Sequence, residues 1–294
     1  MQCTGDMAGR PSRFGDYEIE APLASGGMGG VFLATHVTSG ERVALKVLDP
    51  LFANHREVVE RLFSEATIAR RASHPGLVSI RAAARSTDDV PYLVMEYLDG
   101  TTLATLAQDG RLEIEMIVGL GAQIAAALAA LHEARVVHCD VKPENLLVLR
   151  ARAWGTLPQV KVIDFGVSRS LDEPARDDAS VAGTPAYMAP EQWKGRPCTA
   201  SDVYSFGCVL YELLTGEPPF DGSLPQLMLA HLEQRPARPS WLRTGLPIDV
   251  ERIVMRALAK DPAMRPTMAE LACELGDIVE TMAATTTMPM ALAV

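Results

Sequence analysis

The spacing of hydrophobic and polar residues changes once along the chain, at Asp99-Gly100. Before this point, short runs rich in β-branched and aromatic residues lie between polar or glycine-containing turns, which is typical of strands. These runs are residues 17–24, 30–35, 41–48, 77–86 and 90–98. In the same part, 56–72 has helical spacing, with these apolar residues on one face: Val59, Leu62, Phe63, Ala66 and Ala69.

After Asp99-Gly100 the apolar spacing is mostly helical. The predicted helices are 103–108, 113–134, 200–215, 224–234, 248–259 and 267–282, and two short strand runs lie at 145–149 and 160–163. The chain is therefore expected to have an α+β fold, with a small β-rich lobe that carries one main helix and a larger helical lobe. A cleft between two such lobes is a usual place for a small-molecule site.

The ends of the chain carry no packing pattern. Residues 1–15 are predicted to form a flexible arm and 283–294 a disordered tail, and the first twenty residues lack the apolar stretch of a secretory signal. The longest apolar run, Met116 to Leu131, is interrupted by Gln123 and is shorter than the ~20 residues that a membrane span needs. We expect a buried core helix there and no membrane span.

Composition narrows the classes of partner. The 294 residues include 27 Lys and Arg against 37 Asp and Glu, a net charge of −10. Such a surface repels phosphate backbones and anionic lipids, so no nucleic acid is expected as a partner. Five cysteines without a C-x-x-C pair indicate neither a disulfide framework nor a zinc site, and they favour a reducing, cytoplasmic location.

A glycine-rich segment lies between the first two predicted strands. Its members are Leu23, Ala24, Ser25, Gly26, Gly27, Met28, Gly29, Gly30 and Val31. Glycines let backbone N–H groups approach an anion closely, although a glycine-rich hairpin turn without a ligand is the structural alternative. Because a strand and not a helix follows, the segment is not a dinucleotide-binding fingerprint.

Lys46 lies inside an apolar run of the next predicted strand. Such a lysine either extends to solvent or meets an anionic partner. Glu65, within the only predicted helix of this lobe, is a possible partner. A Lys46–Glu65 pair beside the glycine-rich segment makes physical sense if phosphates bind there.

Two further segments place oxygen-bearing side chains next to short strands. They are the run from His138 to Asn145, which contains Asp140, and the Asp164-Phe165-Gly166 tripeptide. Mg²⁺ prefers such oxygen ligands and shares its coordination shell with phosphates. Each segment alone could be a turn, but the order and spacing of all four segments together indicate a nucleotide–metal site.

In this order the segments resemble the eukaryotic-like (Hanks-type) protein kinases, and most closely their bacterial serine/threonine branch. The resemblance covers about residues 17–282 and includes the later segments VMEYLDG, GTPAYMAPEQ, SDVYSFGCVLYELLTGEPPF and KDPAMRP. It implies a kinase domain at 16–282, with an N-lobe to about 95, a hinge at 96–100 and a C-lobe at 101–282. It also implies ATP as a partner, Mg²⁺ (or Mn²⁺) as the metal, and serine or threonine hydroxyls of proteins as acceptors.

The resemblance further implies roles for individual residues. In the nucleotide site, the glycine-rich segment covers the phosphates, Lys46 positioned by Glu65 holds them, and the adenine is bound by Val31, Ala44, Met95, Glu96, Leu98 and Leu147. In the catalytic segment, Asp140 accepts the proton of the attacking hydroxyl, Lys142 contacts the γ-phosphate, and Asn145 and Asp164 hold the metal.

The remaining implied residues concern the protein substrate and the scaffold. Lys142 together with Thr184 resembles the pattern of kinases that phosphorylate serine or threonine. Glu144 is either a contact for a basic substrate residue or a solvated acid. Glu191 is expected to pair with Arg265, and Asp202 to bind backbone N–H groups of the catalytic segment.

Three features depart from the family pattern. Ala24 replaces a glycine, residues 150–159 with Trp154 lengthen a hairpin, and Cys139 replaces the arginine that usually precedes the catalytic aspartate. Because cysteine cannot bind a phosphate as arginine does, we expect activity without phosphorylation of the activation segment. In that segment, Asp177 and Asp178 could supply fixed charge or be solvated, and Ser180 is a hydroxyl close by.

Two other functions remain possible from the sequence. A pseudokinase would bind nucleotide as a scaffold, and only Ala24 and Cys139 favour it. A small-molecule kinase would share Asp140, Asn145 and Asp164 but would not need GTPAYMAPEQ to bind a peptide. The sequence indicates neither the substrate protein nor the oligomeric state.

Overall fold

The computed structural model describes residues 13–150, 156–172 and 183–286. Residues 1–12 of the predicted arm, Trp154, the acids Asp177 and Asp178, Ser180 and the end of the chain after residue 286 lie outside the described residues. The prediction of a flexible arm is wrong for Arg13–Phe14, which form a strand paired with Tyr17 and Glu18. The described chain forms two compact units, and each is described by itself. The first consists of the chain up to Arg70 together with Ser79–Leu98, and the second of Arg71–Val78 together with the chain from Asp99 onward.

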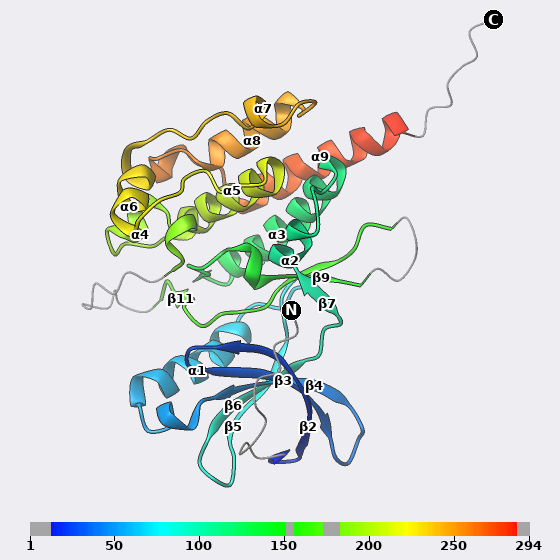
Figure 1. Ribbon diagram of the computed structural model, residues 1–294, viewed down its shortest axis with the longest axis vertical. Coiled ribbons are helices and arrows are strands. Elements are labelled where there is room, and N and C mark those ends of the chain that lie inside the picture. The colour runs from blue at the N-terminus through cyan, green and yellow to red at the C-terminus, as the bar shows by residue number, and fades with distance from the viewer. Residues whose placement is uncertain (1–12, 151–155, 173–182, 287–294) are drawn as a thin grey trace, which may run out of the picture. The chain divides into compact units, whose positions relative to one another are not determined.

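The first unit is an antiparallel sheet with one long helix (Figure 1). Its strands lie in the order β1-β2-β3-β4-β6-β5. Their bounds are β1 Arg13–Phe14, β2 Tyr17–Gly26, β3 Gly29–His36, β4 Arg42–Leu48, β5 Ile80–Arg85 and β6 Pro91–Glu96, and the helix is α1, Arg56–Ala69. One face of the sheet closes around a core of alternating strand residues: Phe14, Phe32, Ala34, Val43, Leu45, Val47, Val90, Tyr92 and Val94.

The buried face of α1 differs in part from the predicted one. Val59, Leu62 and Ala66 are buried as expected, but Glu65 and Ile68 are buried in place of Phe63 and Ala69. The helix therefore presents a buried carboxylate along with its apolar residues, and the partner of that carboxylate is Lys46.

The second unit is mainly helical and contains two small sheets, β10-β9-β7 and β11-β8. Its strands are β7 Gly100–Thr102, β8 Val136–Val137, β9 Leu146–Leu149, β10 Val160–Val162 and β11 Arg169–Ser170. Its helices are α2 Leu103–Gln108, α3 Ile114–Glu133, α4 Pro190–Trp193, α5 Thr199–Thr215, α6 Leu224–Glu233, α7 Pro239–Leu242, α8 Ile248–Ala257 and α9 Met268–Thr286. The helix α9 continues four residues past the predicted end at 282.

The segment Arg71–Val78 belongs to the second unit, although the sequence analysis assigned it to the N-lobe. Two backbone hydrogen bonds attach it there, from Val78 N–H to Val162 O (2.9 Å) and from Val162 N–H to Gly76 O (2.8 Å). These hydrogen bonds to β10 attach the segment to the second unit. The sequence could not show this, because residues 71–78 have no strong hydrophobic pattern of their own.

The apolar helix α3 lies in the core of the second unit. It is long and apolar enough to cross a membrane by length and composition alone. Its buried residues include Ile117, Leu120, Ile124 and Leu128, and it packs along α9 (Figure 1). Since core helices of globular proteins pass the same test, the predicted core helix agrees with the packing.

Candidate active site

The glycine-rich segment forms a hairpin whose two strands are β2 and β3. Ala24 pairs with Val31 and Gly26 with Gly29, so Gly27 and Met28 form the turn. A Cβ atom at Gly29 would lie 2.1 Å from the Val47 carbonyl oxygen, whereas one at Gly27 would meet nothing within 4 Å. The close approach of β4 therefore requires glycine at 29 whatever the hairpin binds, a packing reason that the sequence did not reveal.

The expected pair between Lys46 and Glu65 is present. The Lys46 Nζ atom lies 2.9 and 2.7 Å from the two carboxylate oxygens of Glu65. Glu65 is 1% exposed, while the lysine side chain keeps 26% of its surface exposed. The ammonium compensates the charge of the buried carboxylate, and the pair fixes the lysine on β4 next to Val31 of the hairpin.

The residues expected around the adenine in the first unit lie on adjacent strands. Ala44 of β4 pairs with Met95 of β6, and both side chains are buried. Val31 and Leu98 are half-buried. The Glu96 carboxylate accepts a hydrogen bond from the Ser79 N–H (2.8 Å), so this side chain fixes the end of β6.

In the second unit, Asp202 holds the catalytic segment through its backbone. This carboxylate is fully buried on α5 and accepts the His138 N–H and the Cys139 N–H, both at 2.8 Å. It also bonds the His132 ring at 2.8 Å. Two charge-assisted bonds to consecutive backbone N–H groups fix the chain just before Asp140, as the sequence analysis expected.

Asp140 lies at the centre of a group of polar side chains. Its Oδ1 atom accepts the Thr184 hydroxyl at 2.7 Å, and its Oδ2 atom lies 2.7 Å from the Lys142 ammonium. Lys142 also donates to the Thr184 hydroxyl at 2.8 Å, and the Asn145 amide donates to Oδ2 at 3.1 Å. The structure therefore brings together four residues that are up to 44 positions apart, and it aims the Asp140 carboxylate at a hydroxyl.

Asn145 and Asp164 lie on neighbouring chain segments. The Ile163 N–H donates to the Asn145 carbonyl (3.0 Å), and Asp164 follows directly. The Asn145 side-chain nitrogen is engaged with Asp140, so its amide oxygen points away from that carboxylate. Among the described residues, no three His, Cys, Asp or Glu side chains gather to hold a metal alone. This arrangement fits Mg²⁺, which commonly takes one or two protein oxygens and completes its shell with phosphates.

The remaining predicted site residues of the second unit are Leu147, Glu144 and Thr184. Leu147 is half-buried on β9, which follows Asn145 directly, and Glu144 is exposed. Thr184 precedes a short 3-10 turn at Pro185–Tyr187.

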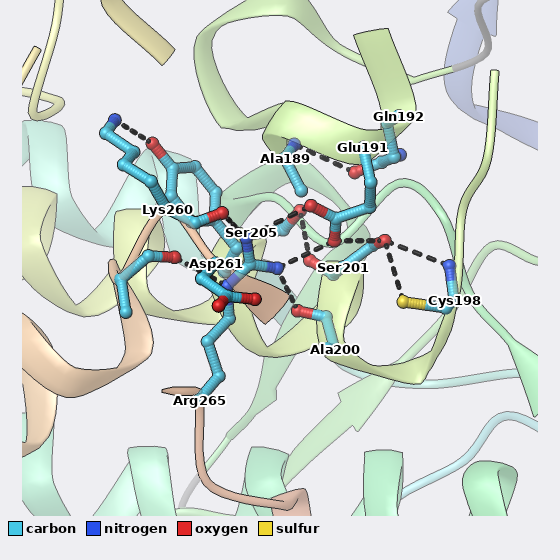
Figure 2. A network of polar contacts seen from close by, with 12 residues as sticks. Ala189, Glu191, Gln192, Cys198, Ala200, Ser201, Ser205, Lys260, Asp261 and Arg265 are labelled. Carbon is cyan, nitrogen blue, oxygen red and sulfur yellow. Dashed lines mark hydrogen bonds and ion pairs between the residues drawn. The ribbon is translucent and has the colours of Figure 1, made fainter. Parts of the chain in front are cut away.

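A buried network anchors the segment after Thr184 to the helical core (Figure 2). Arg265 donates to both carboxylate oxygens of Glu191, at 2.7 and 3.0 Å, and also to the Ala200 carbonyl at 2.7 Å. Ser201 donates to the same Glu191 carboxylate at 2.6 Å. The predicted Glu191–Arg265 pair is therefore present, and its role is structural.

Sequence reasoning missed Glu212 on α5. Its carboxylate accepts the Tyr187 hydroxyl at 2.6 Å. Burial raises the pKa of Glu212, the Tyr187 bond opposes this, and the charge of Glu144 raises the pKa further. Glu144 therefore adds negative charge in the neighbourhood of Glu212, and no local sequence pattern links these two residues, which are 68 positions apart.

These features together define a protein kinase domain. A glycine-rich hairpin, a buried Lys–Glu pair, and an aspartate held by a lysine, a threonine and an asparagine occur in the order of that fold. The family model for the protein kinase domain matches residues 17–274, and the chain belongs to this family.

The chain is similar to serine/threonine-protein kinases of bacteria. It is 38% identical over 268 residues to serine/threonine-protein kinase PknB of Mycobacterium leprae, covering 88% of this chain and 42% of that protein. It is also 38% identical over 257 residues to serine/threonine-protein kinase Pkn1 of Myxococcus xanthus, covering 86% of this chain and 36% of that protein. The chain thus spans about two fifths of the length of these relatives.

Among solved structures, the PknI kinase domain of Mycobacterium tuberculosis is similar. The TM-score is 0.70 with 25% sequence identity, and the match covers 90% of this chain and 97% of that one. The α+β kinase fold expected from the sequence is confirmed.

Proposed function

We propose that this chain is the catalytic part of an ATP- and magnesium-dependent serine/threonine protein kinase that acts on bacterial protein substrates in the cytoplasm. The observation that carries the proposal is the Asp140 carboxylate, which Lys142, Thr184 and Asn145 hold in place. The names of the bacterial relatives support serine and threonine as the acceptors.

In this reaction the acceptor hydroxyl oxygen attacks the γ-phosphorus of ATP, and the bond from that phosphorus to the leaving ADP oxygen breaks. Asp140 orients the hydroxyl and accepts its proton. Lys142, which lies 2.7 Å from Asp140, would neutralise charge on the transferred group. Because phosphoryl transfer needs little covalent chemistry from the protein, positioning and charge stabilisation supply most of the rate.

The nucleotide is assigned to the residues that the family resemblance indicates. Lys46, fixed by Glu65, holds the phosphates under the glycine-rich hairpin, and Ala44 and Met95 contribute buried apolar surface for the base. The kinase domain is assigned to residues 16–282, which includes the range matched by the family model.

Asn145 and Asp164 are the residues that would hold Mg²⁺, and Mn²⁺ would suit the same oxygen ligands. When bound, the ion would supply positive charge that stabilises the charge developing on the transferred phosphoryl group. The Gly166 N–H donates to the Asp164 carboxylate at 3.0 Å and so fixes the direction of that side chain.

The acidic pair Glu144 and Glu212 favours substrates with a basic residue near the acceptor. The charge of Glu144 contributes to the raised pKa of Glu212, so a substrate arginine or lysine would relieve this repulsion. A peptide library with arginine or alanine at successive positions before the serine tests this preference. Glu144→Gln should reduce the discrimination and leave kcat for a neutral peptide unchanged.

The function itself is tested with labelled ATP, Mg²⁺ and a generic basic protein. Asp140→Asn keeps the shape of the side chain but removes the proton acceptor, so the rate should fall about 10²–10⁴-fold while ATP still binds. Asp249→Asn, at an exposed position on α8, is a matched control and should retain full activity. Nucleotide binding without any label transfer by the wild-type chain would instead establish a pseudokinase.

A further inference from the structure

Asp172, just past the strand β11, lies between two arginines. Its Oδ1 atom accepts the Arg135 side chain at 2.5 Å, and its Oδ2 atom accepts the Arg71 side chain at 3.1 Å. The same Arg71 donates to the Ser170 hydroxyl at 2.5 Å, and the Asp172 N–H donates to that hydroxyl at 3.2 Å. All four residues belong to the second unit. We call this group the Asp172 clamp.

The clamp lies at one end of a very short strand pair. β8 and β11 form two residue pairs, Val137 with Arg169 and Val136 with Ser170. Just beyond them, the Leu171 N–H donates to the Arg135 carbonyl at 2.8 Å. A two-stranded ladder of this length has little stability of its own, so contacts at its ends add to the packing of its buried residues Val136 and Val137.

The other end of this ladder leads to the proposed catalytic residues. Asp140 follows β8 after two residues, and Asp164 precedes β11 within the same loop. There the Ser168 hydroxyl donates to the His138 carbonyl at 3.2 Å, which ties the two segments together. The segment after β8 therefore carries the proposed proton acceptor, and the loop before β11 carries the proposed metal ligand.

Arg135 has a backbone conformation that is unusual for its residue type. Its φ angle is +59°, in the left-handed region that glycine or asparagine occupies at lower cost. An arginine here turns the chain into β8 and also brings a planar cation, suited to a carboxylate, to Asp172.

We propose that Asp172 is a positioning residue for phosphotransfer: held by Arg71 and Arg135, it fixes the β8–β11 ladder and thereby the relative placement of Asp140 and Asp164. The inference rests on the proposed function and adds a positioning residue to it, because a carboxylate fixed by two arginines holds the end of the ladder. The residues that hold Asp172 come from distant parts of the chain, 101 and 37 positions away.

The test uses phosphatase-treated protein that mass spectrometry shows to be unmodified. Asp172→Asn keeps the shape and removes the charge, and Asp172→Glu keeps the charge. Asp249→Asn is the control, because it breaks a surface pair with Arg252 (3.0 Å) of similar exposure in the same unit. We expect kcat to fall about three- to tenfold in Asp172→Asn, with KM for ATP and peptide little changed.

Two further comparisons separate positioning from general stability. Asp172→Glu should recover most of kcat, and raising the salt concentration should lower wild-type kcat toward that of Asp172→Asn, since exposed ion pairs are screened. An Asp172→Asn kcat equal to wild type, a change confined to KM, or failure of Asp172→Glu to recover activity would overturn the proposal.

Hydrogen exchange provides a readout that does not depend on catalysis. In Asp172→Asn the amides of 136–137 and 169–171 should exchange faster than in wild type, and in Asp249→Asn they should not. If the wild-type chain transfers no phosphate, the proposed function fails while this measurement still decides whether the clamp fixes the ladder. Unchanged exchange, or faster exchange with full kcat, would refute the positioning role.

Discussion

Acid should destabilise the second unit through one buried histidine, His231 on α6. Its ring is fully buried, and its Nδ1 atom lies 3.0 Å from the Tyr204 hydroxyl. The Lys260 ammonium donates to the same hydroxyl at 3.0 Å, and Phe220 meets the histidine ring edge-on at 5.1 Å. A protonated imidazole would therefore be a second cation in an apolar pocket that already holds one.

The surroundings of His231 determine the direction and size of its pKa shift, and therefore of the loss of stability in acid. Burial, and then the charge of Lys260, lower the pKa of His231 from 6.5 to about 4. The unfolded chain thus takes up a proton near pH 6.5, whereas the folded chain resists it until about pH 4. Stability is retained above pH 6.5 and is lost as the pH falls through this window. By linkage, His231 alone should remove about 2 kcal/mol between pH 7.5 and pH 5.

The assay compares urea unfolding of the wild-type chain and of His231→Gln at pH 7.5, 6 and 5. Glutamine keeps a polar partner for Tyr204 but cannot take up a proton in this range. We expect the wild type to lose about 2 kcal/mol more than the variant on acidification, which corresponds to roughly 4–8 °C in Tm. Other titrating groups are common to both chains and cancel in the difference.

A second variant separates the two causes of the lowered His231 pKa, which are burial and the charge of Lys260. Lys260→Met removes the neighbouring cation and keeps the burial, so its acid sensitivity should decrease only slightly, because burial is the larger cause. Equal acid sensitivity in wild type and His231→Gln would refute the reasoning, since it would mean that the folded chain protonates His231 as readily as the unfolded chain does.

Three further outcomes follow from the contacts described above. Lys46→Met should weaken the rise in Tm that ATP and Mg²⁺ produce, and a thermal-shift titration measures this loss. Arg265→Met leaves the buried Glu191 charge unpaired and should cost about 3–5 kcal/mol in urea unfolding, part of which Glu191→Gln should restore in the double variant. Unphosphorylated wild-type protein should show full activity from its first turnovers, and a lag that autophosphorylation removes would contradict the interpretation of Cys139.

The sequence predicted those elements that are long enough to show a hydrophobic periodicity or that contain a known motif. The helix α3 follows from its apolar run, and the Lys46–Glu65, Glu191–Arg265 and Asp202 contacts follow from family motifs. The four-residue helices α4 and α7 were not predicted, because one turn has no periodicity to detect. The end of α9 was placed too early because threonines at 281 and 285–287 looked like a frayed tail, although Ala283 and Ala284 favour helix.

Contacts between polar residues that are distant in the sequence could not be predicted either. The Asp172 clamp joins residues 71, 135 and 172, and the acidic pair joins 144 and 212. Neither set has a local pattern, and each partner alone is an ordinary surface charge in the sequence. Only the strand pair β8–β11 and the burial of α5 bring them together, so such sites require the fold. The roles assigned to the nucleotide and metal residues stay predictions until the variants above are measured.

The surroundings of Cys139 bear on the expectation that activity does not require a phosphate on the activation segment. Its φ angle is +66°, and its backbone is held on both sides, with the N–H on Asp202 and the carbonyl accepting the Gln192 amide, each at 2.8 Å. The thiol is 2% exposed, and burial raises its pKa well above the ordinary value, so it stays neutral. A neutral, buried group cannot attract a phosphate or reach one in solvent. The position before the proposed proton acceptor is therefore fixed by its backbone, and in our proposal Asp172, paired with Arg71 and Arg135, is the charged group that holds the neighbouring strand pair.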